Sequence, residues 1–216
     1  MEEDIYKERR KVMVKEQIEG RGIRDKRVLS AMLDIPRDVF VEEREREDAY
    51  KDFPLPIGYG QTISQPYIVA LMTSLLELKG DEVVLEIGTG SGYQSAILSY
   101  LAAEVWTIER ISELGERARK TLEKLGIKNV HLIVGNGTLG LPEYAPYDRI
   151  IITAASPDVP KPLIDQLKDN GIMVIPMGER YTQRLVVITK EKGMIKEKDR
   201  GGCVFVPLIG KYGFKE

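Results

Sequence analysis

The feature that most constrains the fold of this chain is a strand that runs directly into a glycine-rich loop. VVLEIG, residues 83–88, is a short apolar run, and Gly88, Gly90 and Gly92 stand at every second position before a helical segment. Glycines let the backbone turn sharply and let a ligand approach the main chain closely. A strand, a glycine loop and a helix in this order indicate an α/β protein that binds a nucleotide-like cofactor at the end of a strand.

Strand and helix patterns alternate along the chain from residue 81 onward. DRIIITAA, residues 148–155, has no polar alternation, so both of its faces should be buried, as in a parallel sheet. This alternation predicts an α/β fold with a doubly wound, Rossmann-like sheet. The expected strands are 83–88, 104–109, 130–135, 148–155, 171–178, 184–191 and 201–209, and the expected helices are 66–78, 92–102, 111–125 and 160–169.

The residues before the sheet divide into two segments of different character. The first is highly charged and has helical spacing at 4–19 and at 26–33, with Asp25 as the N-cap of the second helix. The second contains three prolines and two glycines, which predict an irregular and functional segment. We therefore predict a single domain over 1–216, made of an N-terminal helical extension (1–50), an active-site segment (51–66) and a Rossmann-like core (67–216).

Composition argues against several kinds of site and partner. The formal net charge is −2, whereas proteins that bind phosphate backbones usually carry a basic surplus, so no nucleic-acid partner is expected. With one cysteine, Cys203, and one histidine, His131, we expect neither an internal disulfide nor a metal site. The charged N-terminal segment and the lack of a long apolar run predict a cytoplasmic protein with no membrane partner.

Two acidic residues lie next to the glycine loop in the predicted sheet. Glu109 ends the second strand, where a carboxylate can accept hydrogen bonds from both hydroxyls of a ribose. Glu86 precedes the loop, and Tyr93 occupies the position of the third glycine of a dehydrogenase loop. The run E-x-G-x-G-x-G looks like the signature of S-adenosylmethionine-dependent methyltransferases, in which the acid can meet the cationic side of the cofactor.

On these motifs the chain resembles the protein-L-isoaspartate (D-aspartate) O-methyltransferases over nearly its whole length. The segment GQTISQP is the most specific, since a generic methyltransferase loop does not predict it. The resemblance implies an S-adenosylmethionine-dependent methyltransferase sheet with an N-terminal helical extension. The matching segments are IPRDVFV (35–41), AYKDFPLPIGYGQTISQPYIVALM (49–72), VLEIGTGSGYQSA (84–96), TIER (107–110), APYDRIIITAA (145–155) and VFVPLIG (204–210).

The resemblance also implies which residues form the site. Ser64 would be the catalytic residue, placed beside the transferred methyl group, although a helix cap beside Pro66 is a second role open to it. The implied substrate contacts are Ser64, Val204, Phe205 and Val206. The implied cofactor contacts are Gln61, Thr62, Ile63, Val69, Glu86, Gly88, Thr89, Gly90, Gly92, Glu109, Arg110, Asn136 and Gly137.

One motif departs from the family pattern. The family usually has Gly-Asp-Gly after the third strand, where the acid addresses the adenine, whereas this chain has Gly135, Asn136 and Gly137. An asparagine side chain keeps a carbonyl acceptor that can serve an adenine amino group. We therefore expect Asn136 to bind the adenine with altered affinity.

The activity implied is methylation of the α-carboxylate of isoaspartyl residues in damaged proteins and peptides, which initiates repair through a succinimide. A carboxylate has a reference pKa of about 4, so it is already the nucleophile at neutral pH and needs no general base. We expect a monomer with no metal. Three alternatives stay open: a methyltransferase acting on transfer RNA or a small molecule, a nicotinamide-dependent oxidoreductase, and a non-catalytic interaction module.

Overall fold

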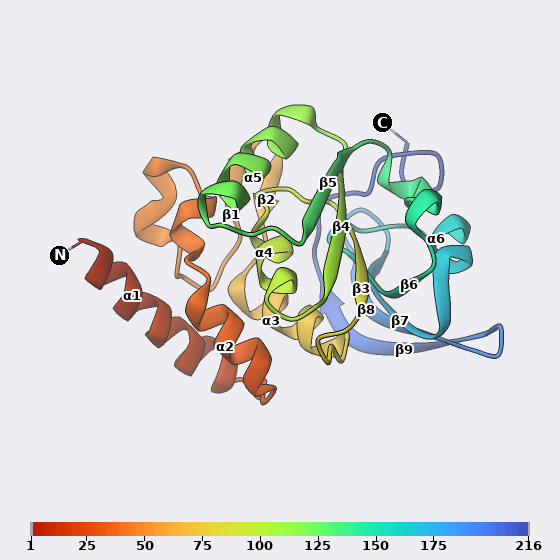
Figure 1. Ribbon diagram of the computed structural model, residues 1–216, viewed down its shortest axis with the longest axis horizontal. Coiled ribbons are helices and arrows are strands. Elements are labelled where there is room, and N and C mark those ends of the chain that lie inside the picture. The colour runs from red at the N-terminus through yellow and green to blue at the C-terminus, as the bar shows by residue number, and fades with distance from the viewer. Residues whose placement is uncertain (1, 216) are drawn as a thin grey trace.

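The computed structural model describes residues 2–215, and its centre is a seven-stranded sheet within these residues (Figure 1). Neighbouring strands run in the order β5 (Val130–Val134), β4 (Glu104–Glu109), β3 (Val83–Ile87), β6 (Tyr147–Ile152), β7 (Leu167–Gly178), β8 (Gln183–Glu191) and β9 (Met194–Cys203). The strands β3 to β7 are parallel to their neighbours, while β8 and β9 continue the sheet as antiparallel hairpins.

The strand order reverses its direction at β3. The chain first winds outward through β4 and β5, and then crosses back to place β6 and β7 on the other side of β3. In open α/β sheets of this kind, ligands bind beyond the carboxyl ends of the strands at the point of reversal. The predicted Rossmann-like sheet is therefore confirmed, and its topology directs the search for a site to the loop after β3.

Helices cover both faces of the sheet, but unevenly. One face packs against α3 (Pro66–Leu75), α4 (Tyr93–Ser99) and α5 (Ser112–Lys124) in the larger apolar core, which includes Val84. The other face, with Leu85 and Ile87, is covered by α6 (Lys161–Gln166) and by the short turns η4 (Gly137–Leu139) and η5 (Pro142–Tyr144). In place of a second helix there, the Tyr144 ring stacks on Trp106 at 3.5 Å between ring centroids.

The N-terminal elements pack on the helical layer rather than on the sheet, and they lie to the left of it in Figure 1. The helix α2 contacts α3 and α4, and η1 contacts α3. Arg37 is fully buried between these parts, where burial lowers its pKa to about 10 and its guanidinium lies 5.0 Å from the Tyr93 ring centroid. The elements are α1 (Glu2–Val12), η1 (Met13–Glu19), α2 (Lys26–Asp34), η2 (Arg37–Phe40) and η3 (Glu43–Asp48).

The prediction that residues 51–66 are irregular was wrong in part. They contain a two-stranded hairpin, β1 (Leu55–Gly58) and β2 (Gln61–Ile63), which is separate from the main sheet. Pro56 is compatible with this strand because a two-stranded ribbon leaves one edge of each strand without a partner. The turn between the strands uses left-handed backbone, with φ of 55° at Tyr59 and 69° at Gly60.

The prediction of a strand at 201–209 was correct only for residues 201–203, which end β9. The last strand of the sheet is β9, which ends at Cys203, and Val204 begins a segment that lies outside the named strands. β9 is an edge strand whose residues are almost all exposed, so its sequence is charged and carries no apolar alternation. The apolar segment that begins at Val204 has the composition of a strand, but it does not continue the sheet.

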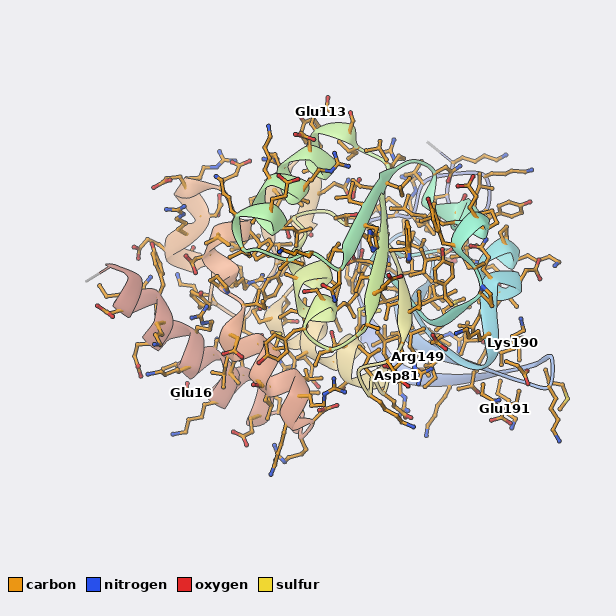
Figure 2. The ribbon with its side chains drawn as sticks, in the orientation of Figure 1. Glu16, Asp81, Glu113, Arg149, Lys190 and Glu191 are labelled. Carbon is orange, nitrogen blue, oxygen red and sulfur yellow. The ribbon has the colours of Figure 1, made fainter. Side chains whose placement is uncertain are left out.

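A buried ion pair stabilises the amino-terminal end of the sheet, opposite the ligand end. Arg149 of β6 lies 3.6 Å from the Glu82 carboxylate and donates a hydrogen bond to the Leu76 carbonyl. Arg149 and Asp81 are labelled at this lower end of the sheet in Figure 2. These contacts connect the end of α3 to the starts of β3 and β6 and so hold the first residues of both strands in place.

The N-cap of α2 provides a test of the local structure of the extension. The Asp25 carboxylate accepts hydrogen bonds from the backbone N–H groups of Arg27 and Val28, as the sequence predicted. We expect Asp25→Ala to lower the free energy of unfolding by about 1 kcal/mol, measured by urea denaturation. Asp25→Asn retains an acceptor and should remain close to the parent protein; equal losses in both variants would contradict the capping role.

Candidate active site

The glycine loop after β3 has a backbone that side chains would not permit. The φ angles are 95° at Gly88, 54° at Gly90 and 88° at Gly92, all in the left-handed region. A Cβ atom on Gly88 would lie 2.5 Å from the Oγ1 atom of Thr153. The loop therefore turns tightly against the end of β6 and leaves main-chain groups exposed to a ligand.

A cleft opens over this loop at the carboxyl ends of β3, β4 and β6. Residues from the β1–β2 hairpin, the start of α3, the glycine loop and the end of β4 meet there. The sequence placed these segments in one site although the predicted residues extend from position 61 to position 206. The predicted residues that line the cleft are Gln61, Thr62, Ile63, Ser64, Val69, Gly88, Thr89, Gly90, Glu109, Arg110, Gly137 and Val206.

Glu109 has the geometry expected of a ribose-binding acid. Its side chain is 6% exposed, and its two carboxylate oxygens accept backbone N–H bonds from Gly90 at 2.8 Å and from Ile111 at 2.9 Å. An ionised carboxylate has about four lone-pair positions, so each oxygen can accept one further hydrogen bond. Two neighbouring hydroxyl groups of a ligand in the cleft could each donate a hydrogen bond to one of these oxygens.

Glu86 lies beneath the loop and does not line the cleft. Its carboxyl group is fully buried and makes a short hydrogen bond with the Ser95 hydroxyl of α4. Within residues 2–215, the other carboxyl oxygen of Glu86 has no hydrogen-bond partner. The nearby hydroxyl groups of Thr107 in β4 and Thr89 in the loop lie 2.6 Å apart. Burial raises the pKa of Glu86 to about 8. Glu86 therefore supports the loop from beneath, whereas the sequence predicted that it meets the cationic side of the cofactor directly.

Two other predicted cofactor residues also stand back from the cleft. Gly92 is the N-cap of α4, and a Cβ atom there would lie 3.1 Å from the Cβ of Ala118, so its role is close helix packing. The side-chain carbonyl oxygen of Asn136 accepts hydrogen bonds from the Thr138 N–H at 3.1 Å and from the Thr138 hydroxyl at 2.7 Å. The acceptor that was expected to serve the adenine is thus used to cap η4, while Gly137 lines the cleft.

A second cavity of about 420 Å³ adjoins the cleft and shares Thr62, Ser64, Thr153 and Val206 with it. Ser64 is not the cap of α3, because the N-cap position is Gln65 and no side chain caps this helix. Within residues 2–215, no hydrogen bond of the Ser64 hydroxyl is found, so this group can donate to a ligand where the two cavities meet.

The other three predicted substrate contacts lie, like Ser64, on the wall of the second cavity, although outside a strand. Val204 is 76% exposed and Phe205 is 8% exposed, and Val206 faces both cavities. The amide groups of this segment are partly engaged, since Phe205 N–H donates to the Gln183 side chain at 2.7 Å. The segment is therefore a fixed wall.

Thr153 was missed by the sequence analysis. The apolar run 148–155 suggested a strand buried throughout, but β6 ends at Ile152 and Thr153 lies at the mouth of both cavities. Its hydroxyl donates to the Gly88 carbonyl, with 2.6 Å between the oxygens. Thr153 is the one polar residue of the apolar stretch 150–155, and this was the signal that could have identified it.

The comparisons with known proteins agree with this geometry. The pattern of the protein-L-isoaspartate (D-aspartate) O-methyltransferase family matches residues 8–213. A protein-L-isoaspartate O-methyltransferase from Dictyoglomus turgidum is 58% identical over 98% of this chain and 96% of its own length. One from Methanoculleus marisnigri is 52% identical over 100% of this chain and 98% of its own.

Similarity extends to solved structures. A candidate protein-L-isoaspartate O-methyltransferase from Plasmodium falciparum, in complex with S-adenosyl-L-homocysteine, is 28% identical and superposes with a TM-score of 0.80. The match covers 94% of this chain and 98% of that one. The shared architecture therefore includes the N-terminal extension as well as the sheet.

The sheet that reverses at β3 and the glycine loop beyond it define a Rossmann-like methyltransferase. The extent of the sequence matches narrows this class, and the chain belongs to the protein-L-isoaspartate (D-aspartate) O-methyltransferase family. The predicted enzyme class is confirmed, and the oxidoreductase and non-catalytic alternatives are excluded. Among residues 2–215, no group of three or more His, Cys, Asp or Glu side chains is placed to hold a metal ion.

The buried Glu86 carboxyl predicts a dependence of stability on pH. In the unfolded chain this group ionises near pH 4.5, whereas in the folded protein it keeps its proton up to about pH 8. Folding is therefore favoured by protonation, and this contribution is lost as pH rises through that window, by at most about 1.4 kcal/mol per pH unit. Relative to Glu86→Gln, the parent protein should lose free energy of unfolding across the window and level off above it. A difference that stays constant with pH would contradict the assignment.

Proposed function

We propose that this protein transfers a methyl group from S-adenosylmethionine to the α-carboxylate of isoaspartyl residues in damaged proteins and peptides, and so initiates repair through a succinimide. The observation that carries the proposal is the meeting of a cofactor cleft and a second, open cavity at Ser64. The family and the names of its close relatives support the choice of substrate.

The residues of the cleft fit S-adenosylmethionine. Glu109 offers two oxygens for the ribose hydroxyls, and Gly88 and Gly137 bring main chain without side chains to the wall of the cleft. The Plasmodium falciparum relative was solved with S-adenosyl-L-homocysteine, the product left after methyl transfer. We assign Gln61, Thr62, Ile63 and Val69 to the wall that covers the cofactor, since they line the cleft from the hairpin and α3.

When bound, the cofactor supplies a methyl group attached to a sulfonium sulfur. The carboxylate oxygen forms a new bond to the methyl carbon as the carbon–sulfur bond breaks, and the sulfur is left as a neutral thioether. The nucleophile is ionised at neutral pH, so the protein has no proton to remove. The Ser64 hydroxyl donates a hydrogen bond that orients the carboxylate at the junction of the two cavities. Alignment of reacting groups in a site that excludes water contributes roughly 7–11 kcal/mol in favourable cases.

The remaining steps of repair need no further catalytic group. The methyl ester collapses to a succinimide when the neighbouring backbone nitrogen displaces methanol, and hydrolysis of the ring returns normal aspartate in part. The enzyme has only to admit an isoaspartyl residue within varied sequences. The second cavity, with its mixed apolar and polar wall, suits that task.

We further propose that the protein is cytoplasmic and acts as a monomer. The cleft and the second cavity are lined by residues of one chain, so a second copy is not needed to build the site. Within residues 2–215, none of the helices combines the length and the apolar character required to cross a bilayer. Light scattering that gives 24.4 kDa supports the monomer, and twice that mass would contradict it.

The decisive experiment offers the protein radiolabelled S-adenosylmethionine and two peptides that differ only in isoaspartate or aspartate at one position. Base-labile methyl transfer to the isoaspartyl peptide alone is the expected result. A transfer RNA and a small carboxylic acid serve as further acceptors, and transfer to either of them instead would support the alternative methyltransferase.

Ser64 provides a test of the chemistry within the site. Ser64→Ala should lower kcat about ten-fold while the Kd for S-adenosylmethionine changes little, since one hydrogen bond to a charged group is lost. Ser64→Thr keeps the hydroxyl and should retain more of the activity than the alanine variant. Isothermal titration of the cofactor, paired with steady-state turnover, makes the comparison; unchanged turnover in Ser64→Ala would exclude the serine from catalysis.

A further inference from the structure

The charged side chains that line the second cavity are all cationic among the residues that the structure describes. Its lining is mostly apolar and neutral, with Tyr67, Ile68 and Phe205 on its walls, and it contains two cations, Arg21 and Arg200. No acidic side chain lines it among the residues that the structure describes. A peptide that places its isoaspartyl residue at Ser64 would carry its neighbouring side chains into this positive environment.

Arg200 owes its position to an irregularity in the sheet. The pairing of β8 with β9 shifts between Arg184 and Val186, so that Arg200 and Gly201 together stand opposite Leu185. Such a β-bulge redirects a side chain, and bulges are frequent next to active sites. Gly201 has φ of 106°, a left-handed conformation that a glycine adopts without strain.

Asp199, which belongs to β9 itself, stabilises the bulge. The Asp199 carboxylate accepts a hydrogen bond from the Gly201 N–H at 2.7 Å, and it lies 3.7 Å from the Arg184 guanidinium. Asp199 is therefore engaged with partners other than its neighbour Arg200. Within residues 2–215, no ion pair of Arg200 is found, so its charge is available to a ligand in the cavity.

Arg21 is the second cation that lines the cavity, and other groups already engage it. Its guanidinium lies 3.5 Å from the centroid of the Tyr67 ring and makes a 2.8 Å ion pair with Asp52. The stacking fixes the side chain, and the ion pair offsets part of its charge. Arg200 is thus the principal cation of the cavity, and Arg21 contributes a weaker positive charge.

We propose that Arg200, supported by Arg21, makes this enzyme prefer isoaspartyl peptides that carry an acidic residue next to the damaged position. The inference rests on the proposed function, because the cavity is joined to the cofactor cleft at Ser64. Both arginines are exposed to solvent, which weakens their attraction for an acidic side chain, so the preference should be about five-fold in kcat/KM. It should decrease as salt screens the charges.

The test uses one isoaspartyl peptide in three forms, with Glu, Ala or Lys at the position before or after the isoaspartate. Base-labile methyl transfer gives kcat/KM for each form at low and at high salt. We expect the Glu form to exceed the Lys form about five-fold at low salt. The ratio should fall towards one in Arg200→Ala and reverse in Arg200→Glu.

A matched control separates the local contact from the overall charge of the protein. Lys192 lies in the exposed turn between β8 and β9, away from the cavity lining, and Lys192→Glu makes the same change of charge as Arg200→Glu. This control should keep the ratio of the parent protein. A ratio near one in the parent, a ratio unchanged by Arg200→Ala, or equal effects of the Arg200 and Lys192 variants would overturn the inference. Failure of all isoaspartyl forms to accept methyl would instead contradict the proposed function.

Discussion

The close approach of three strand ends around β3 is the constraint on which the rest of the structure depends. A Cβ atom at Gly88 would lie 2.5 Å from Thr153, and one at Gly137 would lie 2.5 Å from the Cγ2 of Ile87. Because no side chain fits at these two points, main chain forms part of the cleft wall, and a cofactor can lie directly against it. The same approach places Thr153 where the cofactor cleft and the second cavity meet.

Two layers of support hold this backbone in place. From below, buried Glu86 of β3 bonds the Ser95 hydroxyl of α4, and the Thr107 hydroxyl of β4 lies 2.6 Å from the Thr89 hydroxyl of the loop. From above, Ile57 of the hairpin lies 3.5 Å from the position of a Cβ on Gly90, and Arg117 of α5 donates to the Ile57 carbonyl. The hairpin of the active-site segment thus encloses the cofactor cleft.

Sequence patterns predicted the buried elements well and the exposed ones poorly. The strands around β3 are apolar because both of their faces are covered, so their periodicity is informative. The edge strand β9 is exposed and charged, and nothing in its pattern distinguishes it from a loop. The segment at 204–206 shows the converse error, since its apolar residues line a cavity wall rather than a sheet.

Patterns in the sequence were enough to predict the class of fold, the glycine loop, the acid at the end of β4 and the family, because each depends on local backbone geometry or on residues in a fixed order. How individual side chains are used depends on contacts that form only in the folded chain. Glu86 is buried and does not line the cleft, and the Asn136 side chain caps a short helical turn. A β-bulge places Arg200 in the lining of the second cavity. Such outcomes depend on which groups meet across the fold, and distances between remote residues are not encoded in their spacing along the chain.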